Sequence, residues 1–294
     1  MNAPVGGRSA SAGGTPVRVG RISFVNCFPL YLHFGEELAA RGFSAEIVEG
    51  TPADLNRLLV AGEIDVALPS SIEFARHAGR LALLPVLSIS SLGAVDSIQL
   101  FGRLPRDELR SVAFSEKSAT SVTLFKVLCR EWAIDPEMAP HTGPLAASLA
   151  HYDGLLLIGD EALTVLRAEI YPHHYDLGEE WRTVTGLPMV YAVLAARREF
   201  VEEREEAAAA VAAALVASKD RCAVHAGATA AAAARRYDFS EDYLLHYFDQ
   251  LKFGFGPEFR RGLAEFYRRA HEVGELEVVP DLELAPPPAP SPRA

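Results

Sequence analysis

Asn26 stands where an apolar extended segment gives way to a helical pattern. The segment 17–22 is rich in β-branched residues, and the apolar spacing after Asn26 is helical, with Pro29 in the first turn, where a missing N–H costs little. An asparagine amide offers donors and an acceptor to a substrate hydroxyl or carboxylate. The same position also suits a helix N-cap, and spacing alone favours that structural role. Because ligands of open α/β sheets bind at such junctions, Asn26 is a candidate for chemistry.

Two serines mark a second junction between an expected strand and an expected helix. Ser70 and Ser71 follow the strand pattern of 64–68 and precede the next helical pattern. Their hydroxyls and the free N–H groups of the helix start would form a corner that accepts an anion. Capping needs only one hydroxyl, which leaves the other serine for a ligand.

A third junction lies between the strand pattern of 111–114 and the helical pattern that follows it. Ser118, Ala119 and Thr120 open this helix, and Ser121 comes next. A Ser-x-Thr start presents two hydroxyls and several N–H groups to one carboxylate. The structural alternative is an N-cap with a surplus hydroxyl, but three hydroxyls within four residues favour contact with a ligand.

Ser91 and Asp160 are isolated candidates. Alternation along an extended segment puts Ser88 and Ser90 on one face and Ser91 on the other, and we expect Ser91 to face the ligand. Asp160 follows the strongly apolar strand pattern of 154–158. Its carboxylate has two interpretations of equal weight, a cap for the next helix or a group that positions a substrate hydroxyl or water.

Histidine and cysteine spacing gives no metal site and no cofactor motif. His173 and His174 have no partner at ligand spacing, so we expect surface histidines in a loop. Cys27, Cys129 and Cys222 are widely separated, which favours isolated thiols over a disulfide framework or a metal knuckle.

Composition limits the kinds of partner. The formal net charge of −11 disfavours nucleic acid, whereas N–H groups at helix starts can still hold a small carboxylate. No apolar run approaches the roughly 20 residues of a membrane helix, so we expect no membrane insertion. Residues 1–16 have the composition of a disordered leader rather than a secretory signal, and residues 285–294 that of a frayed tail. We therefore expect a cytoplasmic protein, whose oligomeric state the sequence does not indicate.

Strand and helix patterns alternate along the chain, which predicts an α/β fold with right-handed crossovers and a largely parallel sheet. A length of 294 residues favours two lobes over one. We expect the chain to cross between them near 97–103 and 186–192. The expected strands are 17–22, 45–48, 64–68, 83–91, 97–101, 111–114, 154–158 and 189–195, and the expected helices are 28–41, 52–60, 71–78, 119–132, 199–225, 228–236, 240–251 and 257–272.

Several blocks of sequence between residue 17 and about residue 200 carry a family resemblance. They read RISFVNCFPLY, GTPADLNRLLVAGEIDVALPSSIEFA, LPVLSISSLGAVDSIQLF, EKSATSVTLFKVL, LLLIGDEAL and YDLGEEWRTVTGLPMVYAV. In content and order they resemble the MqnA family of menaquinone biosynthesis, the chorismate dehydratases of the futalosine pathway. The sister family that makes 1,4-dihydroxy-6-naphthoate usually ends its first strand in a Cys-Pro-Asn-Asp turn, and residues 24–29 differ from that turn.

The resemblance implies the bilobal fold of type II periplasmic binding proteins, with a helical C-terminal part. On this basis the first lobe comprises residues 17–100 and 190–284, and the second lobe comprises residues 101–189.

The resemblance also implies loss of water from chorismate, without a cofactor, to give 3-[(1-carboxyvinyl)oxy]benzoate. Asn26 and Ser91 are then the expected catalytic residues. The expected substrate contacts are Ser70, Ser71, Ser118, Ala119, Thr120 and Asp160, of which Ser118 and Thr120 would hold a carboxylate. Two alternatives stay open, a cytoplasmic module that only binds a small carboxylate and the sister naphthoate synthase.

Overall fold

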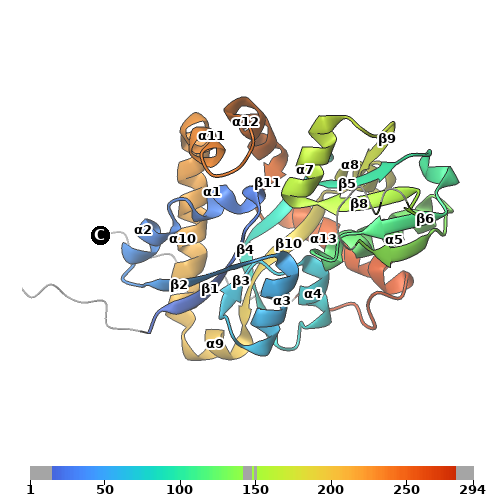
Figure 1. Ribbon diagram of the computed structural model, residues 1–294. Helices are drawn as coiled ribbons and strands as arrows, with labels where there is room; N and C mark the ends of the chain where they lie inside the picture. Colours follow the sequence, from blue (N-terminus) through green and yellow to red (C-terminus); the bar gives the residue numbers. More distant parts are fainter. Residues whose placement is uncertain (1–14, 142–147, 149–150, 283–294) are drawn as a thin grey trace, which may run out of the picture.

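The computed structural model describes residues 15–141, 148 and 151–282, arranged as two lobes that are each built on a mixed sheet (Figure 1). The expected leader and the expected tail fall almost entirely outside the described residues. The predicted bilobal α/β architecture is confirmed.

The first sheet has the strand order β11-β4-β10-β3-β1-β2. Strands β1, β2 and β3 are parallel to one another, whereas β10, β4 and β11 join by antiparallel pairing. The strands are β1 (Val17–Ile22), β2 (Ala45–Gly50), β3 (Val66–Ala67), β4 (Leu81–Ser91), β10 (Met189–Arg197) and β11 (Leu251–Lys252). The helices of this lobe are η1 (Val25–Cys27), α1 (Phe28–Tyr31), α2 (Phe34–Ala39), α3 (Pro52–Ala61), α4 (Ser71–Arg76), α9 (Arg198–Glu203), α10 (Glu205–Val224), α11 (Ala226–Ala234) and α12 (Glu241–Gln250).

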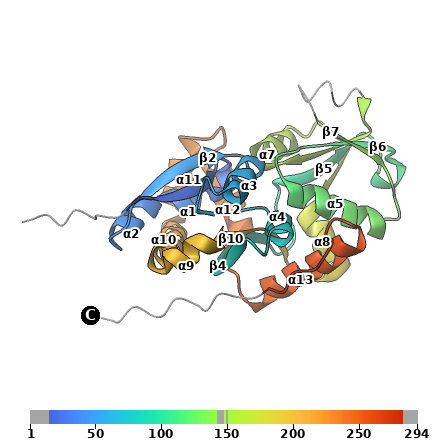
Figure 2. The same cartoon turned by 90° about the horizontal axis from the view of Figure 1, so that it is seen from below.

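The second sheet has the order β7-β6-β8-β5-β9. Its strands are β5 (Ile98–Gly102), β6 (Ser111–Phe114), β7 (Glu137–Pro140), β8 (Gly154–Ile158) and β9 (His173–Asp176). Its helical elements are η2 (Arg106–Glu108), α5 (Ala119–Glu131), α7 (Gly159–Ala168) and α8 (Leu177–Thr185). The last helix, α13 (Pro257–Glu272), packs on β10 of the first lobe and on α5 of the second, and it lies along both lobes in Figure 2.

The expectation of a largely parallel sheet is wrong. Both sheets are mixed, because the strands next to the crossings pair antiparallel with their neighbours: β4 with β10 in the first sheet, and β5 with β8 and β9 in the second. Strand β4 ends at Ser91 and β5 begins at Ile98, so the first crossing covers residues 92–97. Ile98–Gly102 thus belongs to the second sheet, whereas sequence analysis placed residues up to 100 in the first lobe. The chain returns between Thr185 and Met189.

The expected helix 28–41 is interrupted for an identifiable reason. Ser218 of α10 inserts its hydroxyl between the Pro29 carbonyl and the His33 N–H, donating to the first and accepting from the second at 3.1 Å each. A side chain in this place replaces the i to i−4 bond of a continuous helix. The segment therefore divides into α1 and α2, and the separate turn η1 precedes them after β1.

The expected loop at His173 and His174 is also wrong, since both residues belong to β9. Adjacent residues of a strand point to opposite faces of its sheet, so the two side chains do not converge. Within the described ranges, no group of three or more potential ligands gathers around a metal position. No described helix is both long enough and apolar enough to span a bilayer.

Candidate active site

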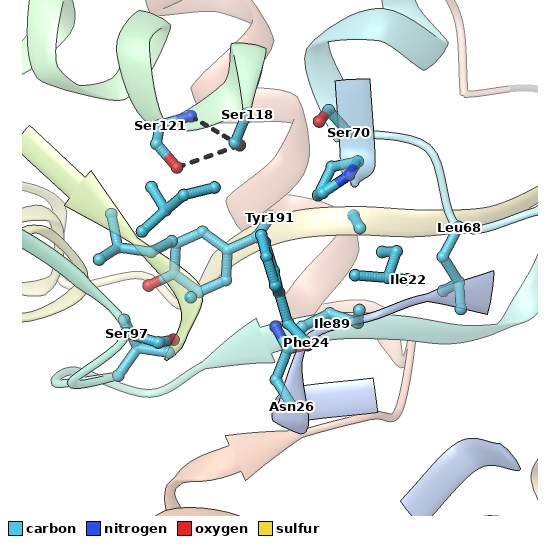
Figure 3. A pocket seen from close by; sticks show the side chains of 16 residues that line it. Ile22, Phe24, Asn26, Leu68, Ser70, Ile89, Ser97, Ser118, Ser121 and Tyr191 are labelled. Atoms are coloured by element: carbon cyan, nitrogen blue, oxygen red, sulfur yellow. Dashed lines mark hydrogen bonds between the residues drawn. The ribbon is translucent and has the colours of Figure 1, made fainter. Parts of the chain in front are cut away.

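A cavity lies between the two lobes at the carboxyl ends of β1 and β3 (Figure 3). It contains about 490 Å³ of space outside protein atoms, its opening to solvent included. None of the described residues that line it carries a charged side chain. The first lobe contributes Ile22, Phe24, Asn26, Pro52, Leu68, Ser70, Ile89, Tyr191 and Ala192, and the crossing and second lobe contribute Val95, Ser97, Ile98, Ser118, Ser121, Ile158 and Gly159.

Asn26 lies in η1, directly after β1, and its side chain lines this cavity. It caps no helix, because the N-caps of η1 and α1 are Phe24 and Cys27. Its Oδ1 is buried and has no hydrogen-bond partner among the described residues. A buried amide oxygen without a partner is costly, which makes it a strong candidate for a ligand contact.

The two serines at the start of α4 have different surroundings. Ser70 is the N-cap residue of α4 but makes no side-chain cap, and it lines the cavity. Ser71 is fully buried, and its Oγ donates to the Val190 carbonyl at 2.8 Å and lies 3.2 Å from Thr120 Oγ1. Of the predicted pair, Ser70 therefore has the hydroxyl that is available to a ligand.

The hydroxyl residues at the start of α5 also differ in their surroundings. Ser118 is the N-cap residue, and its Oγ accepts from the Ser121 N–H at 3.4 Å and from the Ser121 hydroxyl at 3.1 Å. Both serines line the cavity (Figure 3). Thr120 points instead to α4, where its Oγ1 accepts from the Ile72 N–H at 3.2 Å. Ala119 lines a separate outer groove.

Ser91 lies next to the cavity rather than on its wall. It is fully buried, and its Oγ donates to the Gly93 carbonyl at 2.7 Å and lies 2.8 Å from the Tyr191 hydroxyl. Since the serine proton is directed to Gly93, the tyrosine hydroxyl is the donor in the second bond. Burial raises the pKa of Tyr191 well above its ordinary value, so this phenol is neutral. Ser91 thus fixes the ring of Tyr191, which does line the cavity.

Asp160 follows the first residue of α7 and does not cap that helix, since the N-cap residue of α7 is Ile158. Its Oδ1 accepts from the backbone N–H of Val25 in the first lobe at 2.9 Å. Burial raises the pKa of this carboxyl, and the Val25 N–H and the charge of Lys117 partly offset the rise. The structure therefore gives Asp160 a bond between the lobes that neither sequence interpretation anticipated.

Sequence reasoning did not assign a role to several residues of the cavity. Tyr191 belongs to a strand whose sequence reads only as a buried apolar run, so nothing singled it out. Ser97 and Ser121 lie in or beside the segments that contain the predicted site residues. Only their places in the fold, on the crossing and in α5, show that they face the cavity. The apolar residues of the wall carry no chemical signal in the sequence at all.

Comparison of whole structures identifies the fold. The product of the Candida albicans gene CA3427, which is described as having the generic periplasmic binding protein fold, superimposes with a TM-score of 0.71 and 13% identity, covering 91% of this chain and 92% of that one. The aliphatic sulphonate binding protein SsuA of Escherichia coli superimposes with a TM-score of 0.65 and 17% identity, covering 91% and 94%. At such low identity these likenesses establish the fold alone.

Sequence comparison is more specific. A protein of Thermus thermophilus named chorismate dehydratase is 38% identical over 199 residues, which are 63% of this chain and 71% of that protein. A second protein of that name, from Campylobacter jejuni, is 30% identical over 176 residues, which are 59% of this chain and 64% of that protein. The sequence model of the family described as Menaquinone biosynthesis matches residues 17–272. The expected family is thereby confirmed, and the chain belongs to the menaquinone biosynthesis family.

Proposed function

We propose that this protein is a chorismate dehydratase, a hydro-lyase that converts chorismate into 3-[(1-carboxyvinyl)oxy]benzoate and water in menaquinone biosynthesis by the futalosine pathway. The observation that carries the proposal is the 38% identity to a protein of that name, over a stretch that covers 71% of its length. The cavity between the lobes, with one free amide and several hydroxyls on its wall, supports it. We place the activity in the cytoplasm, because the three cysteines are isolated free thiols.

The reaction needs a proton removed from C3 and a hydroxide released from C4, which leave together as water while the ring becomes aromatic. The C3 proton is acidified through the adjacent double bond by the carboxylate at C1. Donors that collect negative charge on that carboxylate stabilise the transition state more than the ground state. Hydroxyls and helix N–H groups at the start of α5 are suited to this role.

We assign the ring carboxylate to Ser118 and Ser121, because both serines line the cavity. Free N–H groups in the first turn of α5 would add to this site. The sequence predicts Thr120 beside Ser118 for this role, but the Thr120 hydroxyl is bonded to α4. Ser70 and Asn26 would then orient the C4 hydroxyl and the enolpyruvyl group from the first lobe.

The proton acceptor in this proposal is the substrate's own enolpyruvyl carboxylate. It is attached through oxygen to C3, so it reaches the departing proton when the side chain folds over the ring. The amide of Asn26 would hold that conformer, since its donors suit a carboxylate and its Oδ1 has no protein partner. The neutral walls of the cavity would strengthen each of these contacts by excluding water.

A solute-binding module is the second candidate, because the solved structures that share the fold include a sulphonate binding protein. Incubation with chorismate separates the two. A dehydratase consumes chorismate and forms a product lighter by one water, observed by chromatography and mass spectrometry. A module that only binds shows saturable heat in calorimetry and leaves chorismate intact. Intact chorismate without binding would instead favour the sister naphthoate synthase.

A further inference from the structure

One hydrogen bond joins the element that carries Asn26 to the opposite lobe. Val25 is the first residue of η1, and its N–H donates to Asp160 Oδ1 of α7 at 2.9 Å. The first N–H groups of a helix have no partner within the helix, and Phe24 offers no side-chain cap. Asp160 supplies from the second lobe the acceptor that η1 lacks in its own lobe.

A close packing contact lies beside this hydrogen bond. Gly159 has a φ of +63°, and a Cβ placed there would lie 2.8 to 3.0 Å from ring atoms of Phe24. The ring of Phe24 thus rests against backbone at the start of α7. Together the two contacts hold both sides of the peptide between Phe24 and Val25 against the second lobe.

Asn26 is the next residue along the chain, inside the same three-residue turn. A shift or rotation of Val25 therefore moves the Asn26 side chain in the cavity. We propose that Asp160 is a positioning residue, which acts through the Val25 N–H to set the direction of the Asn26 amide and does so only when the lobes are together. This inference rests on the proposed function, since it assigns Asn26 to the reaction.

Asp160 is not a candidate for direct contact with the substrate in this arrangement. Its neighbours Ile158 and Gly159 line the cavity, whereas Asp160 does not. Its bonded oxygen, Oδ1, is directed to the first lobe. An asparagine has the same shape and keeps an acceptor for the Val25 N–H, so the positioning role does not need the charge.

The first arm of the test measures kcat and KM with chorismate. Asp160→Ala should lower kcat by about 10- to 100-fold, as expected for a small misplacement of a reacting group, with little change in KM. Asp160→Asn should restore most of that loss. Glu161→Ala is the matched control, because it removes the other first-turn carboxylate of α7, which pairs with Lys117 rather than with Val25. It should leave kcat unchanged.

A double-mutant cycle tests whether Asp160 acts through Asn26. In an Asn26→Ala background, Asp160→Ala should change kcat by less than about twofold, because the amide that it positions is already gone. Losses that multiply would overturn the proposal, since they would mean that Asp160 acts independently of Asn26. Equal losses in Asp160→Asn and Asp160→Ala would also overturn it, because the charge would then be the active property.

The second arm needs no substrate. Hydrogen exchange measured on a peptide that contains Val25 should become faster in Asp160→Ala, and it should stay slow in Asp160→Asn and Glu161→Ala. Unchanged exchange in Asp160→Ala would overturn the positioning contact whatever the enzyme does. If instead the wild-type protein fails to consume chorismate while exchange responds as described, the proposed function fails and the contact stands.

Discussion

The parallel strands of the first sheet differ at their two ends in whether the polar side chains bond to other groups of the protein. At the amino ends, the Asp65 carboxylate accepts from the backbone and side chain of Arg18, with distances of 2.5 to 3.1 Å, and from Arg197 at 2.9 Å. At the carboxyl ends, Asn26 and Ser70 follow β1 and β3, and their side chains have no hydrogen-bond partner among the described residues. Groups that bond to each other stabilise the fold, and groups that remain free are available to a ligand.

The largest expected effect is at the carboxyl ends of these strands, where these polar side chains have no partner in the described part of the chain; we call this the free end of the sheet, and the amino ends with Asp65 the paired end. Asn26→Ala should lower kcat by about 100-fold or more, because the amide is proposed to hold the conformer in which the substrate takes its own proton. KM should rise by less than kcat falls, and thermal unfolding should change little, because the Asn26 side chain makes no hydrogen bond to the described residues. Steady-state kinetics with chorismate and a melting curve check both. An unchanged kcat would remove Asn26 from the mechanism.

The next effect should appear mainly in substrate affinity. Ser118→Ala with Ser121→Ala removes the hydroxyls at the start of α5 that face the cavity, and each charge-assisted bond lost is worth about 1.5–3 kcal/mol. We expect KM to rise at least tenfold, while the lost cap lowers the free energy of unfolding by about 1 kcal/mol.

Ser71→Ala with Thr120→Ala is the matched control for that experiment. It removes two hydroxyls of the same kind that bond across the junction of α4 and α5. This pair should lower the free energy of unfolding, because the Ile72 N–H and the Val190 carbonyl lose buried partners. A larger rise in KM than in the first pair would show that the carboxylate is held by Thr120 after all.

Much of the architecture could be predicted from the sequence pattern. Which of two neighbouring hydroxyl residues faces the cavity could not. The strand and helix patterns and the junctions at Asn26, Ser70 and Ser118 follow from apolar spacing and capping chemistry. Ser70 differs from Ser71, and Ser118 from Thr120, through contacts with other elements: Ser71 bonds to Val190 of β10 and lies within hydrogen-bond distance of Thr120, which itself bonds to α4. Those contacts depend on how α4 and α5 pack, which spacing along one segment does not contain. Asp160 is the same case, because its partner lies 135 residues away.

Asp65 at the paired end should affect stability and leave turnover intact. Burial alone would raise the pKa of Asp65, but hydrogen bonds from Arg18 and Arg197 and the charge of Arg18 hold that pKa below its ordinary value. Asp65→Asn should lower the free energy of unfolding by about 2 kcal/mol at neutral pH, less than for a fully buried pair because both arginines are partly exposed. Urea unfolding measures this difference, and kcat should not change.

The same carboxylate gives a pH dependence with a definite sign. A lowered pKa in the folded state means that its contribution is complete above the ordinary pKa of about 4 and is lost as pH falls through the folded value. The wild-type protein should therefore lose its advantage over Asp65→Asn below about pH 4. An advantage that persists at still lower pH would show that hydrogen-bond geometry, rather than ionisation, accounts for the stabilisation.

The smallest expected effect concerns the histidines. None of the nine lines the cavity, where the described polar groups are an amide, a neutral phenol and hydroxyls that bind protons poorly. Replacing each histidine in turn by glutamine should thus leave kcat within about twofold of the wild type, and kcat should show no titration near the ordinary histidine pKa of about 6.5. A single folded variant that still binds chorismate but no longer turns it over would identify the replaced histidine as the general base. That result would contradict a proton acceptor within the substrate.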